Sequence, residues 1–517
     1  MKRRTFLGAA GLAVGASVVA GCGRPRTTAA PSVPAGPPRR GGRLRVGMMG
    51  AGKSESFNPS GATSALINMA MTCAVYDSLV DIGPNMEIRP ALATRWTSGK
   101  DARTWTLTLR EGVTWHDGKP FTVQDVIYTL RWMADPDNQL SVSVANVDLD
   151  HVKATGPHGI VIPLKSPDLL FPQTISACWV VQDGTTDFSK PVGTGPFIFA
   201  SLDQGRQSVC RRNPVYWDKG KPYVDELVIQ SIDDNMARVN ALLGGQIDVL
   251  AQMPFTQARA HASSGIRLLD TPSTASQAFY MAVDRKPFDD VRVRQAMRLL
   301  VDRRQLVDVA LFGFGTVAND LFGKGLEFYA DAIPQRKRDV QQARALLAQA
   351  GYADGLTVTL ETAAVAPGMV EAATLFAQQA KDGGVTINVS QVDATSYFDP
   401  TLQYLQRPFA QTLWAGFANL ANFYQYAVLP DGYGNETHWT KEQTGVQVAA
   451  AMAATRESAA QSAWLAVQQE QWDAGGYIWW ANVNNLDATS SRVAGITPSR
   501  YLALGLPSGL ANAYFTA

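Results

Sequence analysis

The chain has 517 residues, and its 46 lysines and arginines nearly balance its 45 aspartates and glutamates. A chain without an excess of positive charge lacks the electrostatic footprint of a nucleic-acid-binding protein, so we expect no nucleic-acid partner. This length, with 46% hydrophobic residues, is enough for two or three domains around a large core.

The N-terminus predicts export. Residues 1–21 combine a charged start with a short apolar run and small residues before Cys22, as a signal peptide does. The run is shorter than the roughly 20 apolar residues that span a bilayer as a helix, which favours a removed signal over a retained span. The arginines at positions 3 and 4 resemble a twin-arginine signal. A general secretory signal is the alternative.

Residues 19–22, Val-Ala-Gly-Cys, resemble a bacterial lipobox, in which the cysteine carries diacylglycerol and becomes the new N-terminus. This predicts a protein on the extracytoplasmic side of the cell membrane, with Cys22 as its lipid anchor. An incidental cysteine is the alternative. Residues 22–41 are rich in proline and lack hydrophobic periodicity, so they cannot bury enough surface to fold. We expect them to form an extended tether between the lipid and the folded part.

Strand patterns come first along the folded part. Leu44–Val46 alternates apolar and polar residues, and Thr104–Leu109 does so again. A short turn then leads to Val113–Lys119, and the two segments together predict a β-hairpin. Thr122 is a typical helix cap, and the apolar residues after it recur at helical spacing, which predicts a helix over Val123–Met133.

Helical patterns dominate the second half of the chain. Apolar residues recur at helical spacing there, and the predicted helices span residues 235–244, 291–312, 340–350, 370–381 and 447–472. Because strands and helices are intermixed along the chain, the predicted class is mixed α/β.

Residues 47–54, Gly-Met-Met-Gly-Ala-Gly-Lys-Ser, fit the phosphate-binding loop G-x-x-x-x-G-K-S and follow a predicted strand. Such a loop must open a long helix whose first amide groups hold the phosphates. Here Pro59 follows within a few residues, and proline disfavours a helical residue before it. An exported protein also meets little ATP. We therefore reject nucleotide binding and expect this loop to face another ligand.

Cysteine and histidine give no sign of a metal or redox site. Cys73, Cys178 and Cys210 lack a Cys-x-x-Cys pair, and their odd number allows at most one internal disulfide in an exported protein. Buried free thiols are the favoured interpretation. The five histidines lack paired metal spacing, and neither G-x-S-x-G nor H-E-x-x-H occurs. We expect no cofactor, no metal and no enzymatic activity.

Six blocks of sequence follow one another in the order typical of one family. They are Tyr76–Val80 with Pro90–Trp96, Trp105–Val126, Val192–Phe197, Arg212–Trp217, Gly245–Val249 and Pro287–Arg303. The chain resembles the dipeptide- and oligopeptide-binding lipoproteins of ABC importers, solute-binding family 5, which also includes nickel-, sugar- and haem-binding members. The tight turns and large aromatic side chains in these blocks suit a scaffold better than ligand contact.

This resemblance implies an α/β, two-lobed periplasmic-binding-protein fold, class II-like and of cluster C, with an extra inserted domain. Lobe I would comprise residues 42–66, 192–270 and 488–517, the inserted domain II residues 67–191, and lobe III residues 271–487. Two lobes that close around a solute give a signal that an importer can recognise. The implied partners are a small solute, an ABC permease and its ATPase subunits, and we expect a monomer.

In dipeptide-binding members of the family, an aspartate in a Trp-x-Gly-Asp turn holds the amino group of the ligand, and an upstream arginine holds its carboxylate. The matching turn here runs from Trp414 to Phe417, so Phe417 replaces the aspartate, and residues 362–367 contain no arginine. We therefore do not expect a zwitterionic dipeptide held by its two termini, since nothing replaces the water lost from its charges.

What remains near this turn is aromatic and rich in amides, a combination that suits sugar rings, apolar side chains and polar backbones. The expected ligand-binding residues are Trp414, Gly416, Phe417, Asn422, Phe57 and Asn58. The first four lie in and after the turn, and the last two belong to the family's Phe-Asn-Pro stretch, which is the expected second wall. Trp479 and Trp480 are expected in the core.

The leading hypothesis is a lipoprotein that captures peptides or peptide-like solutes for an ABC importer. On the same scaffold, a neutral oligosaccharide or another non-peptide ligand fits the lost anchors almost as well. A surface sensory protein without a transporter is a further alternative, and an extracellular enzyme on this scaffold is the least favoured.

Overall fold

A computed structural model describes residues 37–261, 265–394, 396–399, 404–430, 432–439 and 441–516. The predicted signal peptide, the lipid anchor Cys22 and most of the predicted tether lie outside these residues. The end of the tether lies within them and is bound to the folded chain: the amide of Arg39 donates to the carbonyl of Phe515 over 3.2 Å, and that of Gly41 to Tyr223 over 2.8 Å.

Eleven strands of the described chain form one large sheet. In spatial order they are β15 (Val385–Gln391), β14 (Leu356–Thr362), β16 (Phe409–Trp414), β12 (Ile266–Met281), β17 (Tyr477–Ser490), β11 (Val249–Leu250), β1 (Arg43–Met48), β10 (Glu226–Ser231), β9 (Gln207–Arg212) and β8 (Phe197–Asp203), with β13 (Gly315–Val317) paired to β17. The predicted first strand is thus confirmed as β1.

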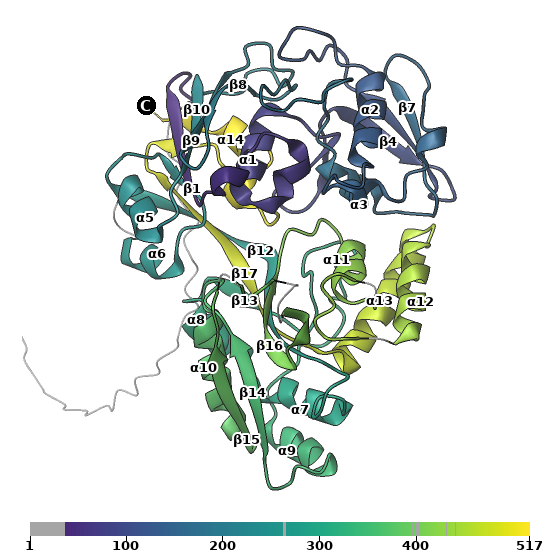
Figure 1. Cartoon of the computed structure of the whole chain (residues 1–517), viewed down its shortest axis with the longest axis vertical. Coiled ribbons are helices and arrows are strands. Elements are labelled where there is room, and N and C mark those ends of the chain that lie inside the picture. Colours follow the sequence, from purple (N-terminus) through teal and green to yellow (C-terminus); the bar gives the residue numbers. More distant parts are fainter. Residues whose placement is uncertain are drawn as a thin grey trace, which may run out of the picture. The chain divides into compact units, whose positions relative to one another are not determined.

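Two long strands join the two parts of this sheet. β12 and β17 pair antiparallel from Ile266 opposite Ser490 to Tyr280 opposite Tyr477, with an irregularity between Pro272 and Ser276. Figure 1 shows them side by side, leading from the neighbourhood of β1 to that of β14 and β16. The predicted boundaries of lobes I and III fall inside these two strands, so the chain crosses between the two parts along continuous backbone.

A separate antiparallel sheet lies within the predicted domain II. Its strands are, in order, β4 (Ala93–Ser98), β5 (Thr104–Leu109), β7 (Gly159–Pro163) and β6 (Lys153–Ala154). Helix α2 (Val123–Met133) has the predicted bounds, and Thr122 and Asp125 form a capping box at its start.

The predicted hairpin in this domain is wrong. Both edges of β5 are occupied by β4 and β7, so Val113–Lys119 has no free edge to join. Instead this segment folds on itself, with the amide of Trp115 donating to the carbonyl of Lys119 over 2.8 Å, and the amide of His116 donates to the carbonyl of Gly193 over 2.9 Å.

Two long predicted helices are each two helices in the structure. Residues 291–312 form α7 (Val291–Leu300) and α8 (Arg303–Ala310), because the side chain of Asp302 accepts from the amide of Gln305 and starts a new helix. Residues 447–472 belong to α12 (Glu442–Met452) and α13 (Glu457–Ala474). Helical spacing of apolar residues continues across both breaks, so periodicity alone does not detect them.

The remaining elements are short or match expectation. The other helices are α1 (Leu66–Val75), α3 (Ser141–Val144), α4 (Phe171–Thr174), α5 (Asn235–Leu243), α6 (Phe255–His261), α9 (Val340–Gln349), α10 (Met369–Lys381), α11 (Leu420–Ala427) and α14 (Gly509–Asn512). Two further strand pairs are β2 (Val80–Ile82) with β3 (Ile88–Pro90), and β18 (Val493–Ala494) with β19 (Tyr514–Phe515). The predicted helices at 235–244, 340–350 and 370–381 are confirmed as α5, α9 and α10.

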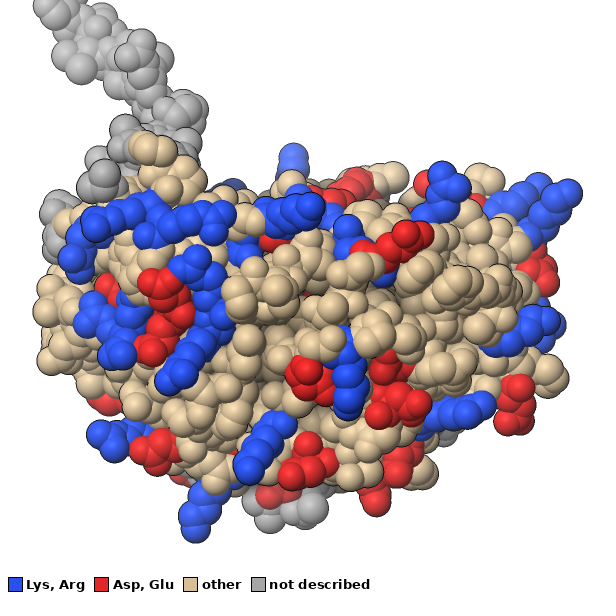
Figure 2. Space-filling view, turned by 90° about the horizontal axis from the view of Figure 1, so that it is seen from above, with Lys and Arg blue, Asp and Glu red and all other residues tan. Residues whose placement is uncertain are grey.

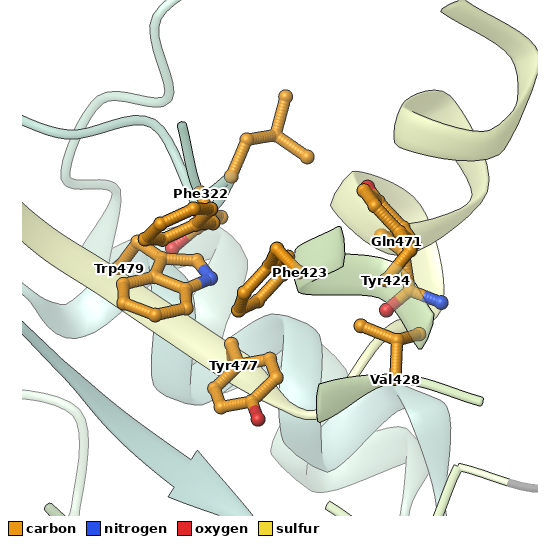
Figure 3. A pocket seen from close by; sticks show the side chains of 9 residues that line it. Phe322, Phe423, Tyr424, Val428, Gln471, Tyr477 and Trp479 are labelled. Atoms are coloured by element: carbon orange, nitrogen blue, oxygen red, sulfur yellow. The ribbon is translucent and has the colours of Figure 1, made fainter. Parts of the chain in front are cut away.

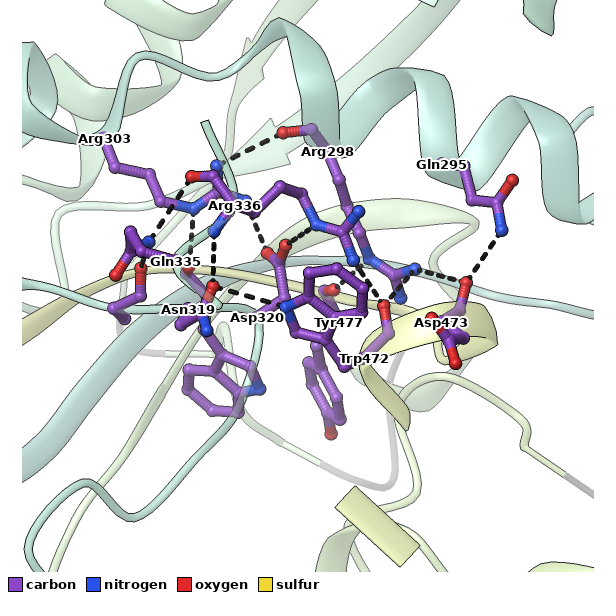
Figure 4. A network of polar contacts seen from close by, with 12 residues as sticks. Gln295, Arg298, Arg303, Asn319, Asp320, Gln335, Arg336, Trp472, Asp473 and Tyr477 are labelled. Atoms are coloured by element: carbon purple, nitrogen blue, oxygen red, sulfur yellow. Dashed lines mark hydrogen bonds and ion pairs between the residues drawn. The ribbon is translucent and has the colours of Figure 1, made fainter. Parts of the chain in front are cut away.

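Buried arginines fix helices α7, α8 and α13 behind β17 (Figure 4). Arg298 is fully buried and donates to the carbonyl of Tyr477 over 3.0 Å and to carbonyls at the end of α13. Burial lowers its pKa to about 9. Asp320 accepts from Arg303 over 2.5 Å and from Arg336 over 2.7 Å. This network holds the base on which the candidate site stands.

The buried residues confirm two predictions about the core. Cys73, Cys178 and Cys210 are buried and free. Trp479 and Trp480 are 1% and 0% exposed. On the surface, the face in Figure 2 carries basic and acidic side chains interspersed. Within the described residues, none of the helices has the length and apolar character needed to cross a membrane.

Candidate functional site

The candidate site begins where β16 ends. Trp414 is its last residue, a turn follows, and α11 starts after Asn419. Gly416 has φ 80°, a left-handed conformation that glycine adopts without strain. The side chain of Asn419 accepts from the amide of Asn422 over 2.9 Å and so caps α11. The turn and the cap place Trp414 and Phe417 beside the outer face of α11.

Four aromatic side chains form a continuous surface there, which we call the aromatic surface: Trp414, Phe417, Tyr426 and Tyr433. The ring centroid of Trp414 lies 5.9 Å from that of Phe417 and 5.5 Å from that of Tyr426, and Tyr426 lies 5.6 Å from Tyr433. Tyr426 is 41% and Tyr433 55% exposed. Tyrosine and tryptophan are enriched at binding interfaces, and adjoining exposed rings offer a contiguous apolar face to a ligand.

The aromatic surface stands on a close-packed aromatic base. Phe423 stacks on Phe322 with centroids 4.1 Å apart, and Trp479 lies 5.9 Å from Phe423. Figure 3 shows these rings around a cavity together with Tyr477. The cavity holds about 10 Å³, which admits one water molecule at most. The base is therefore filled by protein side chains and leaves the outer rings as the accessible part.

A buried carboxylate lies behind the aromatic surface. Glu436 is 0% exposed, and the indole Nε1 of Trp414 donates to its Oε2 over 3.2 Å. Tyr477 donates to the same oxygen over 3.1 Å, while Tyr404 and Thr412 each donate to Oε1 over 2.6 Å. Burial raises the pKa of Glu436 to about 7. Glu436 was not predicted from the sequence, because it lies in a segment without periodicity or motif.

A glycine lets the backbone approach the same indole. A Cβ atom on Gly434 would lie 2.5 Å from Cη2 of Trp414, well inside van der Waals contact. Only a residue without a side chain fits there. Gly434 and Glu436 thus contact Trp414 from one short segment, and together they fix the ring's position.

A polar hollow of about 250 Å³ adjoins the turn at Ala418. Its walls come from the β2–β3 connection, α4 and the loop after β13, and include the carboxylates of Glu87 and Glu327. Glu87 pairs with Arg89, whereas Glu327 accepts a hydrogen bond from Gln173. Partial burial raises the pKa of Glu327. The turn lacks the carboxylate expected in it, but the carboxylates of Glu87 and Glu327 lie in the adjoining hollow.

The structure brings together four of the six residues expected at the solute, namely Trp414, Gly416, Phe417 and Asn422. It places Phe57 elsewhere: this ring is 2% exposed and packs edge-on against Phe199, 5.1 Å away, in a different hydrophobic cluster. The side chain of Asn58 caps a 3₁₀ turn by accepting from the amide of Ser60 over 3.0 Å. Contact of any of these residues with solute stays a prediction.

The loop at residues 47–54 is not built to hold phosphate. After β1 the chain makes one 3₁₀ turn, Gly52–Ser54, and a second 3₁₀ segment, Pro59–Ser64, rather than a long helix. The buried carboxylate of Glu55 accepts from the amide of Ala51 over 3.1 Å and from that of Gly205 over 2.8 Å. An anion of the protein itself thus occupies one of the loop's own amides, that of Ala51, which supports the rejection of nucleotide binding.

Over the ranges that the structure describes, no three His, Cys, Asp or Glu side chains gather as a metal site would require.

Comparison with known proteins identifies the family of the chain. The family described as bacterial extracellular solute-binding proteins, family 5 Middle, matches residues 87–435. The glutathione-binding protein GsiB of Salmonella typhimurium is 28% identical over 348 residues, which cover 66% of this chain and 68% of that protein.

Solved structures confirm the predicted fold class. The ABC transporter substrate-binding protein CtaP of Listeria monocytogenes superposes with a TM-score of 0.82 at 21% identity, covering 93% of this chain and 100% of its own. The periplasmic binding protein DppA of Helicobacter pylori, solved with the peptide STSA, gives a TM-score of 0.74 at 20% identity over 93% of this chain and 99% of its own. The α/β, two-lobed binding-protein architecture is therefore shown.

Proposed function

The chain belongs to the bacterial extracellular solute-binding proteins of family 5, and on that premise we propose that it captures peptides or peptide-like solutes and passes them to the permease of an ABC importer. The observation that carries the proposal is the aromatic surface at the end of β16. β16 pairs with β12, which pairs in turn with β17, and these two long strands join both parts of the sheet. A solute bound there is positioned to influence how these parts close.

The chemistry of the site favours a peptide with one free amino group. Phe417 removes the carboxylate from the turn, but Glu327 lies in the hollow that adjoins Ala418. A protonated amine there would meet this carboxylate, while the aromatic surface packs against side chains of the solute. Two similar proteins support a peptide-like solute: GsiB is named as a glutathione-binding protein, and DppA was solved with a peptide.

A neutral oligosaccharide is the second candidate. The exposed rings of Tyr426 and Tyr433 offer flat apolar faces of the kind on which sugar rings stack, and they need no charge on the ligand. The Glu327 carboxylate distinguishes a peptide from a neutral oligosaccharide as ligand, because an oligosaccharide has no amine for this carboxylate to hold. We propose no catalytic activity for either.

Location and assembly complete the proposal. We propose that Cys22 carries a lipid, that the proline-rich tether of residues 22–41 connects it to the folded chain, and that the protein works as a monomer on the extracytoplasmic side of the cell membrane. The lipobox-like sequence at residues 19–22 and the proline-rich composition after it support this arrangement.

Calorimetric titration tests the proposal with three probes: reduced glutathione, the peptide Ser-Thr-Ser-Ala and maltotetraose. We expect a peptide to bind and maltotetraose not to bind. Tyr426→Ala and Glu327→Gln should each weaken peptide binding about tenfold, as loss of one stacking or charge-assisted contact does. Tyr223→Ala, an aromatic change in ring contact with Tyr514 instead, should leave affinity unchanged. Binding of maltotetraose alone would establish the second candidate.

A further inference from the structure

The site contains a buried acid with only uncharged donors around it. The four hydrogen-bond donors to Glu436 are two tyrosines, a threonine and a tryptophan. A carboxylate taken from water without a cationic partner costs stability, and a neutral side chain of the same shape avoids that cost. A costly acid in contact with a ring of the binding surface points to a role in that surface.

The bonds to Glu436 change when it takes up a proton. In the ionised state both oxygens are acceptors, which matches four donors. In the neutral state one oxygen must donate, and Tyr477 can accept there because its own hydroxyl also lies 3.3 Å from the carbonyl of Ala427. The bond from Trp414 goes to this same oxygen, Oε2. It then loses the assistance of the negative charge and becomes a weaker, neutral hydrogen bond.

We infer that Glu436 is a positioning residue of the solute site: its carboxylate holds the indole of Trp414, and uptake of a proton loosens that ring and lowers the affinity for solute. This inference rests on the proposed function. Trp414 contacts Phe417 and Tyr426, so its orientation also governs the rest of the aromatic surface. Solute is therefore held more tightly above neutral pH than below it.

Other ionisable groups lie near Glu436. Burial and the nearby carboxylate raise the pKa values of Tyr404, Tyr477 and Tyr280, so these hydroxyls keep their protons at neutral pH. Arg407 donates to Glu361 over 3.1 Å. His438 follows two residues later.

His438 is the group most easily confused with Glu436. Its Nδ1 lies 2.8 Å from Asp284 and its Nε2 lies 2.6 Å from the carbonyl of Leu405, so its contacts do not include Trp414. An imidazole titrates in the same pH range as the proposed switch. A variant at this position is therefore needed as a control.

The test follows the Trp414 indole directly. Protein carrying ¹⁵N-indole tryptophan is titrated from pH 5.5 to 8.5 by NMR, and Trp414→Phe identifies the Trp414 signal. We expect that signal to shift with a midpoint near pH 7 in the wild type and in His438→Gln, and to stay constant in Glu436→Gln. A constant signal in the wild type overturns the inference, as does a shift that persists in Glu436→Gln. If Glu436→Gln fails to fold, a constant Trp414 signal in the wild type still overturns the inference.

Affinity for reduced glutathione at pH 6 and pH 8 gives the second readout. The quantity compared is the ratio of the affinity at pH 8 to the affinity at pH 6. We expect this ratio to be about fivefold larger in the wild type than in Glu436→Gln, which is the difference between a charge-assisted and a neutral hydrogen bond. If the wild type and Glu436→Gln show the same ratio of affinities, the inferred effect of Trp414 on solute binding is wrong. If glutathione does not bind at all, that result counts against the proposed capture of peptide-like solutes, and the NMR titration still decides the role of Glu436.

Discussion

Replacing Glu436 by glutamine should change how the stability of the protein depends on pH. Burial raises the pKa of Glu436 from 4.5 to about 7, so the folded state holds this proton more tightly than the unfolded state does. The associated stability is present in full below pH 4.5 and is lost as pH rises through 7. At 1.36 kcal/mol for each pH unit between these values, the loss is about 3 kcal/mol. Glutamine resembles the protonated acid and cannot ionise.

Urea unfolding measures this difference. At pH 4.5 the free energies of unfolding of wild type and Glu436→Gln should be similar, and at pH 8 the variant should be more stable by about 3 kcal/mol. Other buried acids with raised pKa values, such as Asp168 and Asp487, are present in both proteins and cancel in the comparison. Glu442→Gln, at an exposed glutamate, should follow the wild type. A wild-type-to-variant difference that stays constant from pH 4.5 to 8 would refute the reasoning.

Three further changes test other features. Asp320→Ala leaves two buried guanidinium groups without their carboxylate, so urea unfolding should show a free energy of unfolding lower by about 3–5 kcal/mol. Asp203→Ala removes the acid of an exposed ion pair and should change this free energy by less than about 1 kcal/mol. Gly434→Ala displaces Trp414, and calorimetry should show peptide affinity falling about tenfold with little change in melting temperature; unchanged affinity would remove the indole from the site. Cys22→Ala should release the protein from membranes in cell fractionation, and retention would contradict the lipid anchor.

Local patterns were sufficient where one segment carries the whole signal. Thr122 and Asp125 cap α2 through side chains three residues apart, and the helix has the predicted bounds. The helix breaks at Asp302 and after Met452 were missed, because apolar spacing continues through them and only a cap or a turn interrupts the hydrogen bonds. The predicted hairpin at Val113–Lys119 was wrong for a different reason: β5 pairs with β4 on one edge and on the other with β7, about fifty residues away in the sequence.

In the candidate site, too, some features could be predicted from the sequence and others could not. Family resemblance located Trp414, Gly416 and Phe417 in one turn, and the structure places them at the end of β16. The sequence also showed that Phe417 stands where a carboxylate is expected. It did not show which acid lies nearby, because Glu436 lies in a segment without periodicity or motif and Glu327 comes from the loop after β13, far earlier in the chain.

The family, the mixed α/β class and the loss of the turn's charge could be predicted from the sequence, because each of these depends on residues that are neighbours in the chain or recur in a fixed order. The burial of Phe57 in a core and the support of Trp414 by a buried acid became apparent only in the folded chain. Burial and hydrogen bonding are properties of surroundings assembled from many segments. The pKa of a glutamate cannot be read from its neighbours in sequence when its solvent has been replaced by side chains from η5 (Tyr404–Gln406), β16 and β17.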